Sequence, residues 1–510
     1  MSLSMEPSAQ NEDSNALVAA TLAGLDPGSN SFRIEAQGSR WEPLQGMRPD
    51  GPPLHPSDFD VVAMHDPGRD RMRLSWQRFV LEPLKATVAY DEIVVGNEGY
   101  IAGGDVALGP QPSHPMKSDR LAAVCRLQQL LNPQLLVGDA LRRQRERGQQ
   151  LMRYVGRQEL DGVPHHVVEI DALPRPISLY LDLASNHVSR LVTQEHDFPC
   201  GDVEIAVVFS DWRNDSGLAF PYLIELSWDG VLIHRETRRH IELNPSLDPE
   251  TYVLPETEPF DPEAYERGLF SEQWVHRSLA MSAPFPLGAG KVITASITPT
   301  IVTIAGGIHH SLAIALDSGV VVVDPPLHED RSLEVIAAIN EMWPDKPITH
   351  LVLTHHHHDH SGGIRAYAAI GAELIVAEGD RDFVVQRCLA RPHTIRPDTL
   401  ALAATQPTVH AVGDNSLSLG DGEIHVHRIS SPHSAEDLVV YVASAKLLFN
   451  ADLFNPGLVR PGGTPPPDWL VFSRDFRKQI EALNLDIEIL VGAHGVPQGG
   501  PYQELINFTE

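Results

Sequence analysis

Apolar and polar positions alternate over short stretches in the first half of the chain, which is the pattern of half-buried β-strands. Turn residues such as Asp161-Gly162 and Asp229-Gly230 separate these stretches. We predict strands over residues 31–37, 59–63, 71–76, 86–95, 100–102, 151–158, 165–170, 177–183, 187–194, 203–212, 222–228 and 234–243. Residues 31–255 are therefore expected to form a mostly antiparallel β domain.

Helical spacing is confined to two places in this half. Ser118 can cap a helix whose apolar residues recur at helical intervals and which stops at Asn132-Pro133. A short helix is also expected over residues 17–25, within an N-terminus of residues 1–30 that is otherwise polar. Such a polar stretch buries little apolar surface, so we expect it to be flexible.

The pattern changes after residues 256–290, a stretch rich in Pro, Glu and Gly that we interpret as a linker with one short helix over 262–267. In residues 291–510, apolar strands alternate with helices. The strands are expected over 292–298, 301–305, 311–316, 319–323, 349–354, 373–377, 438–443, 447–450 and 487–492, and the helices over 330–342, 364–370, 380–390 and 473–483. Two β halves with helices outside them predict an α/β sandwich of two sheets covered by helices.

The composition is that of a globular and strongly acidic chain. Its 510 residues suffice for roughly two to four domains. The 39 Lys and Arg against 68 Asp and Glu give a net charge of −29, which repels nucleic-acid phosphates in the absence of a basic patch. No apolar run reaches the length of a membrane span. We expect a small-molecule substrate, no nucleic-acid partner and no membrane span.

The cysteines and the first residues of the chain do not identify the cellular compartment of the protein. Cys125, Cys200 and Cys388 lie far apart and form no Cys-x-x-Cys motif, so at most one disulfide can form. The opening residues have no apolar segment of the kind found in signal peptides. We expect a cytoplasmic protein, or a periplasmic or secreted one if a signal peptide has been trimmed. The oligomeric state is also left open.

The densest chemistry lies between a predicted strand and a predicted helix, where residues 354–363 read Thr-His-His-His-His-Asp-His-Ser-Gly-Gly. At the end of an extended strand, alternate side chains point the same way, so His355 and His357 can reach one metal ion. Asp359 and His360 fall on the following turn and can reach a second ion. The other two histidines of the run are expected to point elsewhere.

This pattern, His-x-His-x-Asp-His preceded by Thr and followed by x-Gly-Gly, resembles the motif of the metallo-β-lactamase superfamily of metal-dependent hydrolases. The resemblance covers roughly residues 290–510 and implies the αββα sandwich of that family. It also implies that further ligands follow later strands. The sequence offers His433, Asp452 and His494 in the order that the family leads one to expect.

The ligands that this resemblance implies are imidazoles and carboxylates from several loops. They are His355, His357 and His433 for a first ion, Asp359, His360 and His494 for a second, and Asp452 as a bridge between both. Three imidazoles suit zinc, whereas a more oxygen-rich second site also suits Mn or Fe. We therefore expect two Zn²⁺ ions, with Mn or Fe as alternatives at either site.

The expected chemistry follows from these charges. Two ions that share a water lower its pKa from about 15.7 toward 7, and the resulting hydroxide can attack a carbonyl carbon. Asp359 is the candidate catalytic residue, because it would accept a proton from this water and pass it to the leaving group. Asp324 matches the superfamily's early aspartate and is expected to orient a loop or a ligand histidine. The alternative is a turn aspartate before Pro325-Pro326.

Substrate contacts are less specified by the sequence. His309 and His310 follow Gly306-Gly307 on an early loop that could flank the metals, although two polar residues opening a strand are the preferred interpretation. Arg460 could meet an anionic group or be only solvated. Its Pro- and Gly-rich loop, residues 455–468, could act as a lid.

The sequence predicts a dinuclear zinc hydrolase that acts on an ester, lactone, thioester or amide. Asp452 stands where β-lactamases with a second-site cysteine have that cysteine, so a β-lactamase is a weaker alternative. An iron-dependent oxidoreductase of the persulfide dioxygenase type is another. The strand–turn–strand units of roughly residues 30–250 resemble the curved sheets of bacterial lipoprotein-carrier and periplasmic anti-sigma-regulator domains. A carrier for an apolar ligand is therefore a third alternative.

Overall fold

The computed structural model describes residues 9–81, 86–103, 114–116, 118–172, 175–214, 217–246, 248–254, 292–306, 309–457 and 467–510. Two compact units are formed, the first from Met1–Trp41, His55–Glu195 and Val203–Ala283, the second from Glu42–Leu54, His196–Asp202 and Pro284–Glu510. Two short segments of the first half thus belong to the second unit. The predicted linker and its helix over 262–267 lie outside the described residues.

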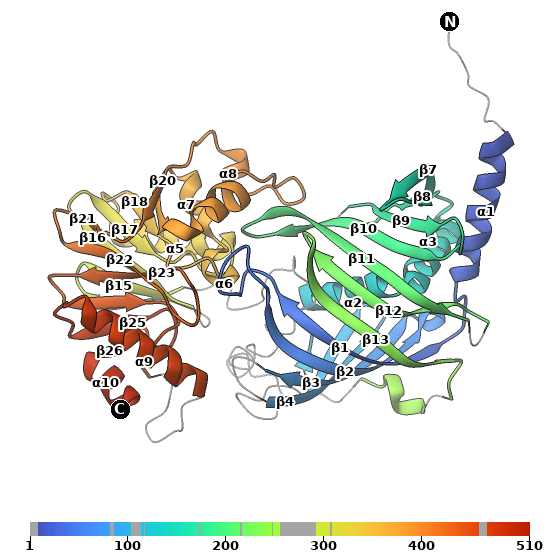
Figure 1. Cartoon of the computed structure of the whole chain (residues 1–510), viewed down its shortest axis with the longest axis horizontal. Helices are drawn as coiled ribbons and strands as arrows, with labels where there is room; N and C mark the ends of the chain where they lie inside the picture. Colours follow the sequence, from blue (N-terminus) through green and yellow to red (C-terminus); the bar gives the residue numbers. More distant parts are fainter. Residues whose placement is uncertain are drawn as a thin grey trace, which may run out of the picture. The chain divides into compact units, whose positions relative to one another are not determined.

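The first unit is built on one sheet of thirteen strands in the order β6-β5-β4-β3-β2-β1-β13-β12-β11-β10-β9-β8-β7. The strands are β1 (Phe32–Glu42), β2 (Leu54–Asp66), β3 (Arg71–Val80), β4 (Ala86–Val95), β5 (Glu98–Gly103), β6 (His114–Pro115), β7 (Met152–Leu160), β8 (Val163–Ile170), β9 (Ile177–Asp182), β10 (Val188–Asp197), β11 (Gly201–Arg213), β12 (Phe220–Trp228) and β13 (Val231–Leu243). The sheet is curved (Figure 1). The predicted antiparallel β domain is confirmed.

The described helices of this unit are α1 (Ala9–Leu25), α2 (Ser118–Leu131) and α3 (Pro133–Arg147), with the short turns η1 (Pro67–Arg69) and η2 (Pro249–Tyr252). Helix α1 is longer than the predicted helix over 17–25, and α3 was not predicted. Asn132-Pro133 ends α2 but also begins α3, with Pro133 in the first turn. Proline is favoured there because the N–H that it lacks would have no partner within the helix.

The interior of the first unit contains buried charged side chains. Arg78 donates from Nε to the Tyr90 hydroxyl at 2.9 Å and is 1% exposed. Arg120 donates to Glu92 at 2.6 Å, and Arg238 donates to Glu236 at 2.9 Å. A carrier of an apolar ligand needs an apolar interior, so these pairs do not favour that alternative.

Two buried histidines make the stability of the first unit depend on pH. Burial, followed by the charge of Arg238, lowers the pKa of His65 to about 3. Burial, followed by Arg40, lowers the pKa of His234 to about 4. Both are neutral in the fold, whereas an unfolded histidine titrates near 6.5. Their stabilisation is therefore complete above pH 6.5 and is lost as the pH falls toward these folded-state values.

We expect the free energy of unfolding to decrease between pH 7 and pH 4.5, measured by urea unfolding followed with tryptophan fluorescence. His65→Phe keeps an aromatic ring beside Phe32, whose ring centroid lies 4.9 Å away. In this variant, the slope of the unfolding free energy against pH should decrease by the contribution of about one proton. An identical slope in both proteins would show that His65 titrates normally in the fold.

The second unit contains two sheets. The first has the order β14-β15-β16-β17-β18-β19-β20 and the second the order β21-β22-β23-β24-β25-β26. Their strands are β14 (Ile293–Thr298), β15 (Ile301–Ala305), β16 (Ser311–Leu316), β17 (Gly319–Val323), β18 (Ile348–Val352), β19 (Glu373–Ala377), β20 (Val409–Val412), β21 (Leu417–Leu419), β22 (Ile424–Ile429), β23 (Asp437–Val442), β24 (Leu447–Asn450), β25 (Ile489–Gly492) and β26 (Gly500–Pro501).

Helices cover these sheets (Figure 1). They are α5 (Glu329–Met342), α6 (His358–Ser361), α7 (Ile364–Ala369), η3 (Glu378–Asp380), the π-helical η4 (Phe383–Leu389), α8 (Thr399–Leu402), α9 (Pro467–Ala482) and α10 (Tyr502–Thr509). The predicted helix over 380–390 is thus a 3₁₀ turn followed by a π-helix. Strands β20 to β22 and helix α10 were not predicted. No described helix is long and apolar enough to cross a membrane.

One apolar core joins the two sheets. Val323 and Val352 of the first sheet pack in the same cluster as Val440 and Phe449 of the second. A second cluster places Phe476 of α9 with residues on the other face of the second sheet. These layers confirm the predicted αββα sandwich, whose continuous apolar strands are buried on both faces.

Candidate metal centre

The ends of neighbouring parallel strands gather the polar side chains of the second unit. Strand β17 pairs in parallel with β18, and β24 pairs in parallel with β25. The residues that follow these four strands are Asp324 after β17, the histidine motif after β18, Asp452 after β24 and His494 after β25. The carboxyl ends of parallel strands share one edge of a sheet, which is where sites in layered α/β folds are built.

Two groups of side chains at this edge are close enough to hold metal ions. The first consists of His355, His357, His433 and Asp452, and the second of His309, His360 and His494. In each group the ligand atoms lie within 4.8 Å of one another. Residues from five separated parts of the chain are thus brought together.

The Asp452 carboxylate lies between the two groups. Its Oδ2 atom is 2.9 Å from His433 Nε2 and 3.1 Å from His360 Nε2. Its Oδ1 atom is 2.9 Å from His494 Nε2. The carboxylate therefore faces histidines of both groups at once, which is the position that a bridging ligand occupies.

The unsatisfied atoms of this cluster fit a metal ion. Buried atoms without a hydrogen bond of acceptable geometry include Nε2 of His355, His360 and His433, Nδ1 of His357 and Oδ1 of Asp452. Buried nitrogen and oxygen atoms are normally hydrogen-bonded, so several unsatisfied ones in one place need an explanation. Imidazole nitrogens and a carboxylate oxygen that face one point are the donor set of zinc.

The charges of the site also fit a cation. Burial, followed by neighbouring histidines, lowers the pKa of His355 and of His357 well below its usual value, so both are neutral and can ligate. Burial also acts to lower the pKa of His360, but the carboxylates of Asp452 and Asp359 raise it well above its usual value. Burial opposes ionisation of Asp452, but His360 and the other histidines hold its pKa well below its usual value. A bound cation would replace the proton on His360 that balances the negative charge of Asp452.

Asp324 is hydrogen-bonded to residues of the histidine motif. Its Oδ1 atom accepts hydrogen bonds from the backbone N–H of Thr354 at 2.9 Å and from its hydroxyl at 2.7 Å. Its Oδ2 atom is 2.9 Å from Nδ1 of His360, and the side chain is fully buried. Since a carboxylate accepts, His360 donates from Nδ1 to Asp324, which turns Nε2 toward Asp452 and leaves that atom as the one that a metal ion would contact in place of a proton. This geometry is the one that the predicted orienting role of Asp324 needs.

Asp359 lies beside the second group without belonging to it. Its Oδ2 atom is 3.0 Å from His309 Nε2 and 3.9 Å from His360 Nε2. His309 takes the place in the second group that the sequence had given to Asp359. The preferred interpretation of His309 as a polar residue opening a strand therefore missed its position. The one available signal was that the loop containing it precedes a strand of the metal-bearing sheet.

The remaining histidines of the run contact other carboxylates. His356 Nδ1 lies 3.5 Å from Asp380, and His358 Nε2 lies 2.9 Å from Asp197. Both therefore point away from the two groups, as the strand alternation predicts. His310 lies 3.1 Å through Nε2 from the carbonyl of Gly495. Arg460, the candidate for an anionic substrate group, lies outside the described residues.

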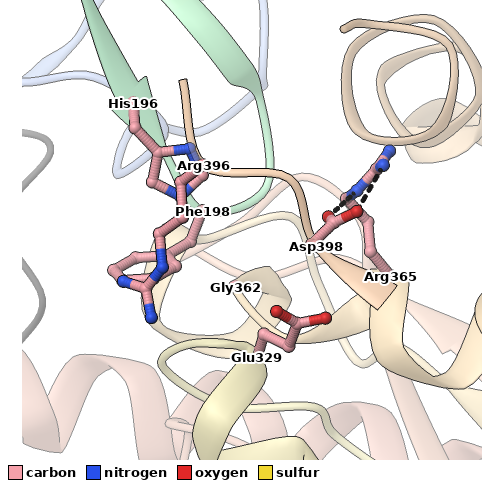
Figure 2. Close-up of a pocket in the computed structure, with 7 residues that line it drawn as sticks. All are labelled: His196, Phe198, Glu329, Gly362, Arg365, Arg396 and Asp398. Carbon is pink, nitrogen blue, oxygen red and sulfur yellow. Dashed lines mark hydrogen bonds and ion pairs between the residues drawn. The ribbon is translucent and has the colours of Figure 1, made fainter. Parts of the chain in front are cut away.

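A small pocket lies beside the motif but not at the metal groups. It is lined by His196, Phe198, Glu329, Gly362, Arg365, Arg396 and Asp398 (Figure 2). Arg365 forms an ion pair with Asp398, with Nη2 2.9 Å from Oδ1. None of the lining residues belongs to either metal group. This pocket therefore does not locate the substrate.

Comparisons with known proteins bear on the second half of the chain. A sequence profile described as the Metallo-beta-lactamase superfamily matches residues 304–494. Similar solved structures include the metallo-beta-lactamase DIM-1, with 16% identity, a TM-score of 0.32 and coverage of 43% of this chain and 95% of that chain. A metallo-beta-lactamase from Pontibacter korlensis has 19% identity, a TM-score of 0.33 and coverage of 43% and 97%. One from Hirschia baltica has 18% identity, a TM-score of 0.32 and coverage of 43% and 95%.

Proposed function

Because the second half of this chain is a domain of the metallo-β-lactamase superfamily, we propose that the chain is a hydrolase that uses two divalent metal ions, zinc first among them. The proposed substrates contain an ester, lactone, thioester or amide carbonyl. The observation that carries this proposal is the gathering of unsatisfied histidine nitrogens around the Asp452 carboxylate. A superfamily that consists mostly of hydrolases supports the class of reaction.

The proposed ligands are those implied by the sequence. They are His355, His357 and His433 for one ion, and Asp359, His360 and His494 for the other, with Asp452 between them. His309 is an alternative to Asp359, since it lies with His360 and His494 in the structure. His309 Nε2 is 3.0 Å from Asp359 Oδ2, so the two side chains compete for one position or share it.

When bound, two such ions supply a water of lowered pKa and positive charge for the oxygen that becomes an anion during carbonyl attack. The protein's own residues orient the reacting groups. In this proposal, Asp359 would accept the water's proton and return it to the leaving group. Asp324 holds Thr354 and His360 at fixed positions, so the motif keeps its shape during the reaction.

Metal analysis separates this proposal from the oxidoreductase alternative. A hydrolase binds zinc and consumes no oxygen, whereas an enzyme of the persulfide dioxygenase type binds iron and consumes oxygen with its substrate. The panel of substrates contains esters, lactones, thioesters and a β-lactam. Hydrolysis of the β-lactam and of no other member would favour the β-lactamase alternative.

The test of the proposal is hydrolysis of this panel by the full chain before and after removal of metal. We expect about two zinc ions per chain, loss of turnover with a chelator and its return with zinc. His357→Ala should lower kcat/KM by roughly 100-fold or more, since it removes one ligand.

The matched control is His410→Ala, because His410 is exposed and pairs only with Glu373 on the surface among the contacts described. Exposed pairs of this kind contribute roughly 0–1 kcal/mol to stability. Equal turnover in wild type and His357→Ala would contradict the proposal, as would turnover that survives complete removal of metal.

A further inference from the structure

Residues 42–54, which connect β1 to β2 along the chain, belong to the second compact unit and lie against its ligand loops. The carbonyl of Leu44 accepts a hydrogen bond from the backbone N–H of His358 at 3.1 Å, within the histidine motif. The carbonyl of Met47 accepts one from Ala435 at 2.9 Å, in the loop that carries the third histidine of the first group. One short segment therefore contacts two of the loops that form the site.

The side chain of Gln45 reaches the candidate catalytic carboxylate. Its Nε2 atom donates to Oδ1 of Asp359 at 2.6 Å, and the residue is only 9% exposed. The other oxygen of Asp359 is 3.0 Å from His309 Nε2. Both carboxylate oxygens are thus held by side chains from different parts of the chain, and these contacts together fix the rotation of the carboxylate plane. Without Gln45, the Oδ1 atom would lose the hydrogen bond that this segment donates.

The next residue contacts a proposed ligand. The carbonyl of Gly46 lies 3.0 Å from Nε2 of His357. A carbonyl only accepts, so Nε2 carries the ring proton and Nδ1 keeps its lone pair. That Nδ1 atom is buried and has no hydrogen-bond partner among the described residues. Gly46 therefore selects the tautomer of His357 that can bind a metal through Nδ1.

The backbone of the segment has an unusual and specific conformation. Leu44 has a φ of +57°, in the left-handed region that a leucine rarely adopts. A Cβ atom on Gly46 would lie 2.2 Å from the carbonyl oxygen of Pro52. Only glycine therefore fits at this position, where the two ends of the segment come close to each other. Strained backbone of this kind persists where the surrounding contacts determine it, often at functional sites.

We propose that residues 42–54 are a clamp of the metal centre, in which Gln45 positions Asp359 and Gly46 positions His357. The clamp comes from the first half of the chain, outside the matched family region of 304–494. It makes metal binding by the second unit depend on a segment that a separate domain of this family would lack. This inference rests on the proposed function only in requiring a bound metal, because it is argued from the contacts of Gln45 and Gly46 with Asp359 and His357.

The test measures zinc affinity of the full chain by competition with a coloured chelator, together with the visible spectrum of the cobalt-substituted protein. Gln45→Ala removes the side chain, and Gln45→Met keeps its approximate size and lack of charge but removes the donated hydrogen bond. We expect both variants to bind one of the two ions about 10-fold more weakly and to change the cobalt spectrum. Arg48→Ala, at an exposed position of the same segment, is the control and should match wild type.

A space-filling role would give a different result, because the uncharged Gln45→Met would then bind zinc as wild type does and leave the spectrum unchanged. That outcome overturns the proposal. Far-UV circular dichroism checks that each variant folds, and if Gln45→Ala does not fold, the size-matched Gln45→Met decides. If the wild type hydrolyses no substrate but the variants bind zinc more weakly than it does, the clamp is supported and the proposed function is contradicted. If wild type hydrolyses a substrate and Gln45→Met binds zinc with unchanged affinity, the proposed function is supported and the clamp is contradicted.

Discussion

Replacing Asp452 by alanine is expected to remove metal from the centre and to lower kcat/KM for hydrolysis by roughly a thousand-fold. The reason is that Asp452 faces histidines of both groups, with Oδ1 2.9 Å from His494 Nε2 and Oδ2 2.9 Å from His433 Nε2. Without this carboxylate, neutral imidazoles would have to hold two divalent cations with no shared anion. Metal content by mass spectrometry and the kinetics of the best substrate of the panel measure both effects.

The control for Asp452→Ala is Asp414→Ala, which removes a carboxylate whose side chain is 93% exposed. It should keep both metal ions and wild-type turnover. An Asp452→Ala protein that still contains two ions per chain would show that Asp452 does not bridge them.

The second large effect is expected for Asp324→Ala, which should destabilise the fold by about 3 kcal/mol. The substitution leaves the backbone N–H and hydroxyl of Thr354 and Nδ1 of His360 without their buried acceptor. It also places alanine at a φ of +61°, which aspartate tolerates better. Urea unfolding of the metal-free protein measures the change without a contribution from bound metal.

Asp324→Asn separates the two causes, because asparagine tolerates the same backbone conformation and keeps one acceptor oxygen. We expect a smaller loss of stability for this variant, together with weaker zinc binding caused by a misoriented His360. A destabilisation of less than about 1 kcal/mol in Asp324→Ala would mean that Asp324 is only a turn residue.

The fold of the second unit was predictable because its strands are short, apolar and bounded by turns. Strands β15, β16, β17, β19 and β24 begin and end where the apolar runs do. The elements that escaped prediction had weaker local signals. Strand β21 has three residues, and α3 begins at the same Asn-Pro pair that ends α2. A helix stop and a helix start cannot be told apart from one proline.

The candidate site was predictable where its residues share a local pattern. The histidine motif has strand-end spacing, and His433, Asp452 and His494 follow strands in a family order. Gln45 has no such pattern, because it lies 314 positions from the Asp359 that it contacts. Its role depends on the path of the whole chain.

His309 illustrates a different limit. A single histidine before a strand is usually solvated, and no spacing links it to the motif. Its contact with Asp359, at 3.0 Å, arises only when β16 is placed beside β17 within the first sheet of the second unit. Tertiary packing, not local sequence, brings it to the centre.

The central claim is that two metal ions lie on either side of Asp452. It is tested most directly by anomalous X-ray diffraction from crystals of the zinc-loaded protein, with data collected on both sides of the zinc absorption edge. We expect two anomalous peaks, one among His355, His357 and His433 and the other beside His360 and His494. A single peak outside this cluster would contradict the claim, as would the absence of any peak in a crystal whose mother liquor contains zinc.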